Sequence, residues 1–221
     1  MNMLNLAFKD LLIQKKSFFF ALLYIVFFMF VFQSLQQAML PAAITAFTYI
    51  LVMGAFALDD KNKADIMLNS LPVRRSMVVT SKYLSVYLFA LIGIVAYMIL
   101  HYIARLAKVS LDIYPVDLSG ILSTFVSISI MNAIFFPLLF KLGYTKAKVI
   151  NLVLFFVFFF GVPELINTAV SGMEGEWQGG LVTFLKTTPD YMITLLLIIG
   201  TLLILSVSWL LSMKLYSKRD F

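Results

Sequence analysis

Cysteine is absent from the chain, and histidine occurs once, at His101. The lack of cysteine excludes a disulfide framework, a thiolate metal site and a cysteine nucleophile. A lone histidine has no second histidine or cysteine with which to share a metal ion. His101 falls at the outer end of a predicted membrane span, beside Tyr102, and is interpreted as a structural residue at the membrane interface. The sequence therefore predicts no metal site.

Catalytic and nucleotide-binding motifs are missing as well. The sequence has neither a G-x-S-x-G nucleophile elbow nor an H-E-x-x-H zinc motif. It also lacks G-x-x-x-x-G-K-[ST], the loop with which many ATPases hold nucleotide phosphates. We therefore expect no enzymatic activity and no cofactor in this chain. Without that loop, the chain is not expected to hold nucleotide phosphates by itself.

Charge is scarce and apolar residues are abundant. Charged residues make up 13% of the chain, against about a quarter in soluble domains. Hydrophobic residues make up 62%, and 22 residues are phenylalanine. This composition predicts an all-α integral membrane protein in which residues 1–221 form one transmembrane domain. The net charge of +6 is then explained by lysine and arginine beside span ends, and nucleic acid is not expected as a partner.

Six apolar segments are candidates for membrane-spanning helices. A helix needs about 20 mostly apolar residues to cross the hydrocarbon layer. Apart from one acidic residue in the fifth segment, the polar groups within these segments are uncharged. The predicted spans run from about Ser17 to Leu35, from Leu40 to Leu58, from Lys82 to His101, from Leu118 to Phe140, from Val149 onward, and from Tyr191 to Met213.

The fifth predicted span has an uncertain end. The apolar stretch 149–163 is too short to cross alone, so it either continues to about Ser171 or breaks at Pro163 and re-enters. Glu164 has two interpretations, a carboxylate at the level of the outer headgroups or a functional intramembrane group. Residues 164–190 are expected to form an outer loop, because they are rich in glycine and carry an interfacial tryptophan.

Lysine and arginine lie mainly on one side of the predicted spans. Of the 17 such residues, only Arg105, Lys108 and Lys186 fall on the opposite side. Cytoplasmic segments of membrane proteins carry an excess of lysine and arginine. The pattern therefore predicts a multi-pass protein whose N- and C-termini lie in the cytoplasm, together with the polar segment 59–82.

Residues 1–16 precede the first span and are amphipathic. This pattern predicts a short helix in the cytoplasmic membrane interface, in contact with lipid, and a disordered tail is the alternative. On a helix, one face carries Leu4, Phe8, Leu11 and Leu12, and another carries Asn2, Asn5, Lys9 and Lys16.

Three serines in the fourth span, Ser119, Ser123 and Ser127, are spaced four apart. Small residues at this spacing allow helices to approach closely, so we expect this stripe to pack against a neighbouring helix. A polar surface along a substrate route is the alternative. Because ion-driven transporters usually carry ionisable groups in their spans, the scarcity of such groups indicates that the energy for any transport comes from outside these spans.

The polar segment 59–82 interrupts the apolar spans and is longer than a turn requires. Within it, residues 65–71 are predicted to form a short helix that ends before Pro72, because the residue before a proline avoids the helical region. Ile66 and Met67 are among the apolar residues of this helix. It is interpreted either as a contact for a soluble partner or as an interfacial loop whose lysine and arginine contact anionic lipid.

Segment 59–82 resembles the signature of permease subunits of type-2 ATP-binding-cassette (ABC) exporters, particularly the small bacterial six-span kind. The departures are Arg74, where a small capping residue is usual, and Met77, where an acidic residue is often found. Ser76 is a candidate substitute for the missing N-cap. The matching residues are Asp59, Asp60, Lys61, Asn62, Lys63, Leu68, Asn69, Ser70, Leu71, Pro72, Val73, Arg75, Ser81, Lys82 and Tyr83.

The resemblance implies a subunit of the bacterial cell membrane that pairs with an identical copy or a paralogue and binds two ABC ATPase subunits. The substrate would be exported and would be apolar or amphipathic, such as a peptide, a lipid or a drug. A membrane anchor or sensor without a transport role is the alternative. The segment would act as a coupling helix, and the ATPase-contacting residues would be Asp65, Ile66, Leu68, Asn69, Leu71, Pro72, Val73, Arg74 and Arg75.

Overall fold

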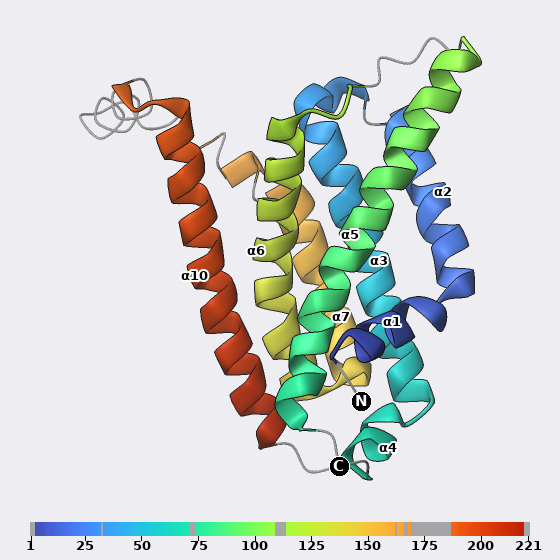
Figure 1. The fold of residues 1–221 in the computed structure, drawn as a ribbon, viewed down its shortest axis with the longest axis vertical. Helices are drawn as coiled ribbons and strands as arrows, with labels where there is room; N and C mark the ends of the chain where they lie inside the picture. The colour runs from blue at the N-terminus through green and yellow to red at the C-terminus, as the bar shows by residue number, and fades with distance from the viewer. Residues whose placement is uncertain are drawn as a thin grey trace.

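The computed structural model describes residues 3–31, 33–70, 74–108, 114–161, 163–165, 168 and 187–218. Within these ranges the regular structure is helical, with no strand. The long helices run side by side in a bundle, and both chain termini lie at the same end of it (Figure 1). The prediction of an all-α membrane protein is confirmed.

Besides residues 163–165, 168 and 187, which are also helical, the described part of the chain has ten helical elements. The first element lies across the base of the bundle, and the short α4 lies at the same end (Figure 1). The elements are α1 (Met3–Leu12), α2 (Lys15–Val31), the 3-10 helix η1 (Gln33–Ala38), α3 (Met39–Lys61), α4 (Ala64–Ser70), α5 (Arg75–Leu106), α6 (Leu118–Leu142), α7 (Tyr144–Phe156), the π-helix η2 (Val157–Gly161) and α10 (Asp190–Ser217).

Five helices of the described chain are long and apolar enough to cross a membrane. The number rises to six if the bent pair Asn5–Leu12 and Ser17–Val31, whose axes meet at 76°, is counted as one span. The predicted first span corresponds to α2, which is 17 residues long. The predicted six-span arrangement is therefore reached only with this bent N-terminal pair.

The boundaries around segment 59–82 differ from the prediction. Helix α3 continues through Asp59 to Lys61, and α5 already begins at Arg75, so both ends of the segment extend the two spans. Lys82 therefore lies two turns inside α5 and does not begin it. At its other end, α5 continues to Leu106, which places His101 within the helix. Hydropathy alone misplaced these boundaries because polar residues can continue a helix beyond the hydrocarbon layer.

The fifth span begins earlier than predicted. Helix α7 starts at Tyr144, directly after Gly143, which has a φ of 74° that suits glycine and allows the chain to reverse after α6. The apolar helical stretch runs from Tyr144 to Leu165, which is 22 residues and long enough to cross. The predicted start near Val149 was wrong, because Lys146 and Lys148 lie inside the first turns of the helix.

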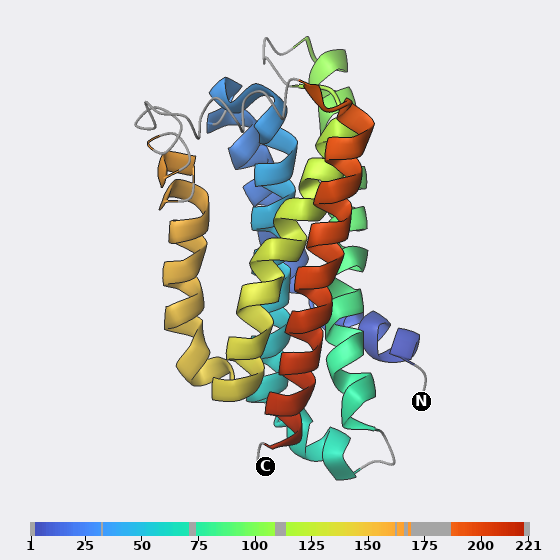
Figure 2. The same cartoon turned by 90° about the vertical axis from the view of Figure 1, so that its left-hand side faces the viewer.

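Only the two ends of the predicted outer loop 164–190, with residue 168, are within the described residues. Pro163, Glu164 and Leu165 are helical and exposed. Helix α7 and its π-helical extension lie on one side of α6, and α10 lies on another (Figure 2). The rest of the loop up to residue 186, including Trp177, lies outside the described residues, and both interpretations of Glu164 remain predictions.

Helix α3 forms the centre of the bundle and packs against α2, α5, α6 and α7. The ring of Tyr49 stacks on Phe155 of α7 at 4.4 Å between centroids and meets Phe135 of α6 at 5.4 Å. Gly93 of α5 lets this helix approach α3 closely, because a Cβ atom there would lie 2.7 Å from the ring of Phe47. Aromatic contacts and one glycine therefore hold the central helices together.

Helix α6 begins as predicted at Leu118, because Asp117 accepts a hydrogen bond from the Gly120 amide at 2.9 Å. Hydrogen bonds from the Ser119 hydroxyl and this amide lower the pKa of the Asp117 carboxyl. The predicted packing of the serine stripe was wrong within this chain. Ser119 and Ser123 are exposed and Ser127 is half-buried. The buried face, one residue further on, carries Gly120, Thr124 and Ile128.

Candidate functional site

The predicted coupling helix is α4, at the end of the bundle where the chain termini lie (Figure 1). A turn at Lys63, whose φ is 49°, separates it from α3. Ala64 is buried, whereas Ile66 and Met67 are 56% and 57% exposed. A short helix at the base of the bundle therefore presents two adjacent large apolar side chains. The side chains of Asp65, Leu68 and Asn69, and residues 71–73, lie outside the described part of the chain.

The two arginines that follow have different roles. Arg74 is exposed and precedes α5 with an extended backbone, and its side chain makes no capping hydrogen bond. Arg75 begins α5 and donates a hydrogen bond from Nη1 to the Ser217 carbonyl at 2.7 Å. The predicted cap at Ser76 was wrong, because Ser76 lies inside the helix, where its carbonyl accepts a hydrogen bond from Thr80 at 2.9 Å. Arg75 therefore ties the base of α5 to the end of α10.

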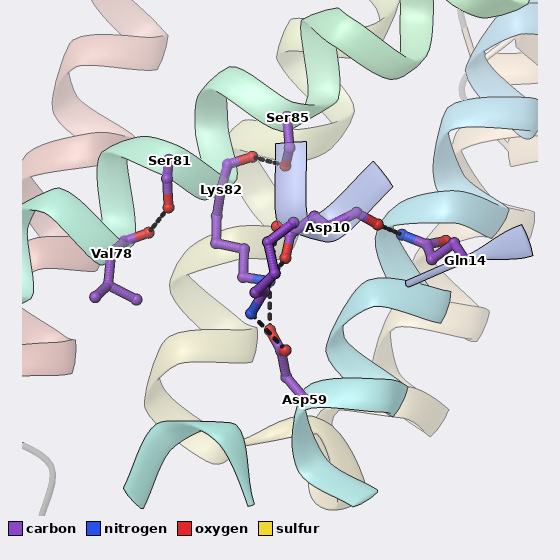
Figure 3. A network of polar contacts seen from close by, with 8 residues as sticks. Asp10, Gln14, Asp59, Val78, Ser81, Lys82 and Ser85 are labelled. Atoms are coloured by element: carbon purple, nitrogen blue, oxygen red, sulfur yellow. Dashed lines mark hydrogen bonds and ion pairs between the residues drawn. The ribbon is translucent and has the colours of Figure 1, made fainter. Parts of the chain in front are cut away.

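A cluster of four charged residues lies just inside this end of the bundle. The Lys82 ammonium of α5 donates to both carboxylate oxygens of Asp10 in α1, at 2.8 and 2.9 Å. It also donates to Asp59 of α3, which approaches from the other side (Figure 3). Lys9 of α1 donates to Asp59 at 2.9 Å and lies 3.5 Å from Asp10. Two cations and two anions thus join three helices.

Burial makes this cluster energetically significant. The side chains of Lys82 and Asp10 are 6% and 2% exposed, and that of Asp59 is 12% exposed. The ammonium also lies 5.0 Å from the centre of the Phe56 ring. Buried charges are stable only when paired, and removing one partner typically costs about 3–5 kcal/mol. The cluster therefore holds α1, α3 and α5 in a fixed relative position.

Sequence reasoning missed this cluster. Lys82 was interpreted as a cytoplasmic lysine at a span end, and the spans were expected to hold no charge besides Glu164. Lys82 is instead buried and paired with Asp59 and Asp10, an ion cluster that the sequence analysis did not anticipate. A signal was present in the sequence, since Asp59 and Lys82 are the two ends of the polar segment and have opposite charge. No local pattern, however, indicates the contribution of Asp10.

The N-terminal helix is present as predicted. Asp10 and Gln14 are buried against the other helices, whereas Phe8 and Leu12 are exposed. The prediction that α1 uses an apolar face toward the membrane is compatible with this arrangement. The face toward the protein combines the buried apolar residues Leu6 and Ala7 with the carboxylate of Asp10. A disordered tail is excluded for residues 3–12, which are helical.

A second polar cluster attaches α10 to the base of α5. The Tyr83 hydroxyl lies 2.6 Å from the Ser208 hydroxyl and 2.9 Å from that of Ser212. Trp209 donates from Nε1 to the Thr80 hydroxyl at 3.0 Å. Neighbouring residues of α5, Lys82 and Tyr83, thus bind helices on different sides of it. The first turns of α5, which follow the predicted coupling helix, are therefore attached by hydrogen bonds and ion pairs to α1, α3 and α10.

Comparison with known proteins agrees with these features. A family model described as "ABC-2 family transporter protein" matches residues 5–217, which is nearly the whole chain. The protein therefore belongs to this family and is a multi-pass membrane subunit of an ABC transporter. Such a subunit associates with an ABC ATPase and is not itself the catalytic component. No curated protein and no solved structure matches the chain.

Proposed function

We propose that this protein is the membrane-spanning subunit of a bacterial ABC exporter. ATP is bound and hydrolysed by separate cytoplasmic subunits, and an apolar or amphipathic substrate, such as a peptide, a lipid or a drug-like molecule, leaves the cell. Two copies of the chain, or one copy and a paralogue, form the pathway. The N- and C-termini and α4 face the cytoplasm, in keeping with the lysine and arginine residues at that end.

The exposure of Ile66 and Met67 on α4 is the observation that carries this proposal. Two large apolar side chains on a seven-residue helix are poorly accounted for by the fold of the chain alone. A groove on the ATPase would bury them. Because α4 connects α3 and α5 in the chain, displacement of α4 would act directly on these two helices.

Residues 65–75 would form the contact with the ATPase. Arg75 makes a smaller contribution than its charge suggests, because its guanidinium already donates to the Ser217 carbonyl. Arg74 is exposed and would lie at the rim of the contact, where a charge mainly affects the rate of encounter. The apolar residues of α4 would then supply most of the binding energy.

Co-purification with a co-expressed candidate ABC ATPase subunit tests the proposal. Ile66→Asp or Met67→Asp should lower the affinity about a hundredfold or more, because an unpaired carboxylate would be buried in an apolar contact. Asn62→Asp is the matched control, since it adds the same charge at an exposed position in the turn before α4. Arg74→Ala should have a small and salt-dependent effect.

The opposite ranking would favour a lipid-contacting loop. In that case Arg74→Ala would weaken membrane-surface binding, and neither aspartate variant would change recovery of the ATPase. Normal recovery with Ile66→Asp and Met67→Asp would refute the coupling role of α4. A chain that never co-purifies with an ATPase, even as the wild type, would instead favour an anchor or sensor.

A further inference from the structure

The two ends of the polar segment 59–82 are joined to each other. Asp59 and Lys82 are paired by an ion pair, and α4 lies between them in the chain. The same Lys82 ammonium is bound by both carboxylate oxygens of Asp10 in α1. The two ends of the segment proposed to contact the ATPase are therefore held together by ion pairs that also bind the N-terminal helix.

We propose that Lys9, Asp10, Asp59 and Lys82 form a charge lock that makes α1 and the lower ends of α3 and α5 one rigid unit. In this role the lock transmits the displacement of α4 to α1, which would then shift along the membrane surface. The part of the inference that concerns ATP-driven movement rests on the proposed function of α4. The locking of α1 to α3 and α5 does not.

The charge balance of the cluster supports a lock. Two lysines meet two aspartates, so the buried group has no formal net charge. Separating α1 from the bundle would remove Asp10 and Lys9 and leave Lys82 with Asp59 alone. It would also bring Asp10 out of a bidentate contact at 2.8 and 2.9 Å. Opening the lock is therefore costly, and the three helices are expected to move together.

The corner between α1 and α2 is fitted closely to α3. A Cβ atom at Gly54 of α3 would lie 2.9 Å from Oε1 of Gln14 and 3.5 Å from the Cβ of Ser17. The corner of the chain at Gln14 and Ser17 therefore contacts α3 at Gly54, where a small added side chain requires only that the end of the Gln14 side chain move. The bundle therefore holds the N-terminal segment at two places, through the charge lock and through this corner.

Thiol reactivity tests the lock on the purified chain. The protein has no cysteine, so Leu6→Cys introduces a single thiol on the buried side of α1, and Asn5→Cys introduces an exposed one as a control. Asp10→Asn should speed maleimide labelling of Leu6→Cys about tenfold and leave that of Asn5→Cys unchanged. Lys82 keeps Asp59 in this variant, which preserves the rest of the fold. Slow labelling of Leu6→Cys in the Asp10→Asn background would refute the lock.

A disulfide tests whether the unit stays rigid during the ATP cycle. The predicted Cβ–Cβ distance of 3.5 Å in Ser17→Cys/Gly54→Cys is within the range for a disulfide. In the reconstituted complex, oxidation of this pair should leave ATP hydrolysis within about twofold of the reduced form, because the parts do not separate. Asp10→Asn should lower the stimulation of hydrolysis by the chain about tenfold. The single-cysteine variants control for the substitutions.

The outcomes separate the inference from the proposed function. Reversible inhibition by the disulfide would show that the start of α2 must separate from α3, and it would overturn the claim that the N-terminal segment stays attached to α3 at this corner. Full stimulation by Asp10→Asn would remove the transmission role. If the wild-type chain does not affect hydrolysis at all, the proposed function fails and transmission fails with it. The thiol measurement on the purified chain would still decide whether the lock exists.

Discussion

The Tyr83 hydroxyl of α5 donates its hydrogen to the Ser208 hydroxyl of α10, across 2.6 Å. The direction follows from the number of hydrogens, because each hydroxyl carries one. Ser208 donates to the Ala133 carbonyl of α6 at 2.7 Å, so it must accept from Tyr83. Ser212 then donates to Tyr83 at 2.9 Å. One directed chain of hydrogen bonds therefore joins α10, α5 and α6 near the base of the bundle.

Tyr83→Phe should destabilise this junction by about 1–3 kcal/mol, because the buried Ser212 hydroxyl loses its acceptor and Ser208 loses a donor. Unfolding in mixed micelles, followed by tryptophan fluorescence, measures the change. Tyr102→Phe is the control, since Tyr102 is exposed. A double-mutant cycle with Ser212→Ala should show coupling between the two positions. Strictly additive effects would contradict the proposed hydrogen-bond chain.

Gly93→Ala should lower stability by about 1–3 kcal/mol, because the new methyl group would lie 2.7 Å from the buried Phe47 ring. Gly200→Ala is a matched helical substitution in α10 with no atom within 4 Å of the added carbon. It should stabilise the protein by up to about 1 kcal/mol, since alanine is the better helix former. Apparent melting temperatures in the same detergent compare the two. A stable Gly93→Ala protein would argue against close packing of α3 and α5.

Arg75→Ala should loosen the end of α10, because the Ser217 carbonyl loses a charged donor at the negative end of the helix. A hydrogen bond to a charged group contributes about 1.5–3 kcal/mol, so local opening should become about tenfold or more frequent. Limited trypsin cleavage after the exposed Lys214 measures this opening. Arg74→Ala should leave the cleavage rate unchanged. Equal cleavage rates in Arg75→Ala and Arg74→Ala would show that Arg75 does not stabilise the end of α10.

The orientation in the membrane is tested by single cysteines in intact cells. Gln37→Cys, in η1 at the opposite end of the bundle from α4, should react with a membrane-impermeant maleimide from outside. Asn62→Cys and Thr145→Cys should react only after the cells are opened, because both lie at the lysine-rich end. The Thr145 hydroxyl donates to Asp60 at 2.9 Å, which places α7 and α3 together there. External labelling of Asn62→Cys would reverse the orientation.

Much of the helical layout could be predicted from local composition. Apolar stretches locate the spans because a helix in lipid must satisfy its own backbone hydrogen bonds. Pro72 and the preceding polar residues likewise predicted α4, which the structure places at Ala64–Ser70. The ends of the helices were less predictable. The early start of α7 depends on the reversal at Gly143, and the continuation of α3 through Asp59 depends on contacts outside the apolar stretch.

Sequence alone determined the helical class, the approximate spans, the position of α4 and the clustering of lysine and arginine, because each depends on residues close together in the chain. Only the tertiary structure decided the environment of Lys82. Its carboxylate partners are 72 and 23 residues away in the sequence, on two other helices. Whether a charged side chain meets lipid, water or an opposite charge is set by how helices pack. Here that packing places Lys82, which resembles the other lysines at span ends in the sequence, at the centre of a buried ion cluster.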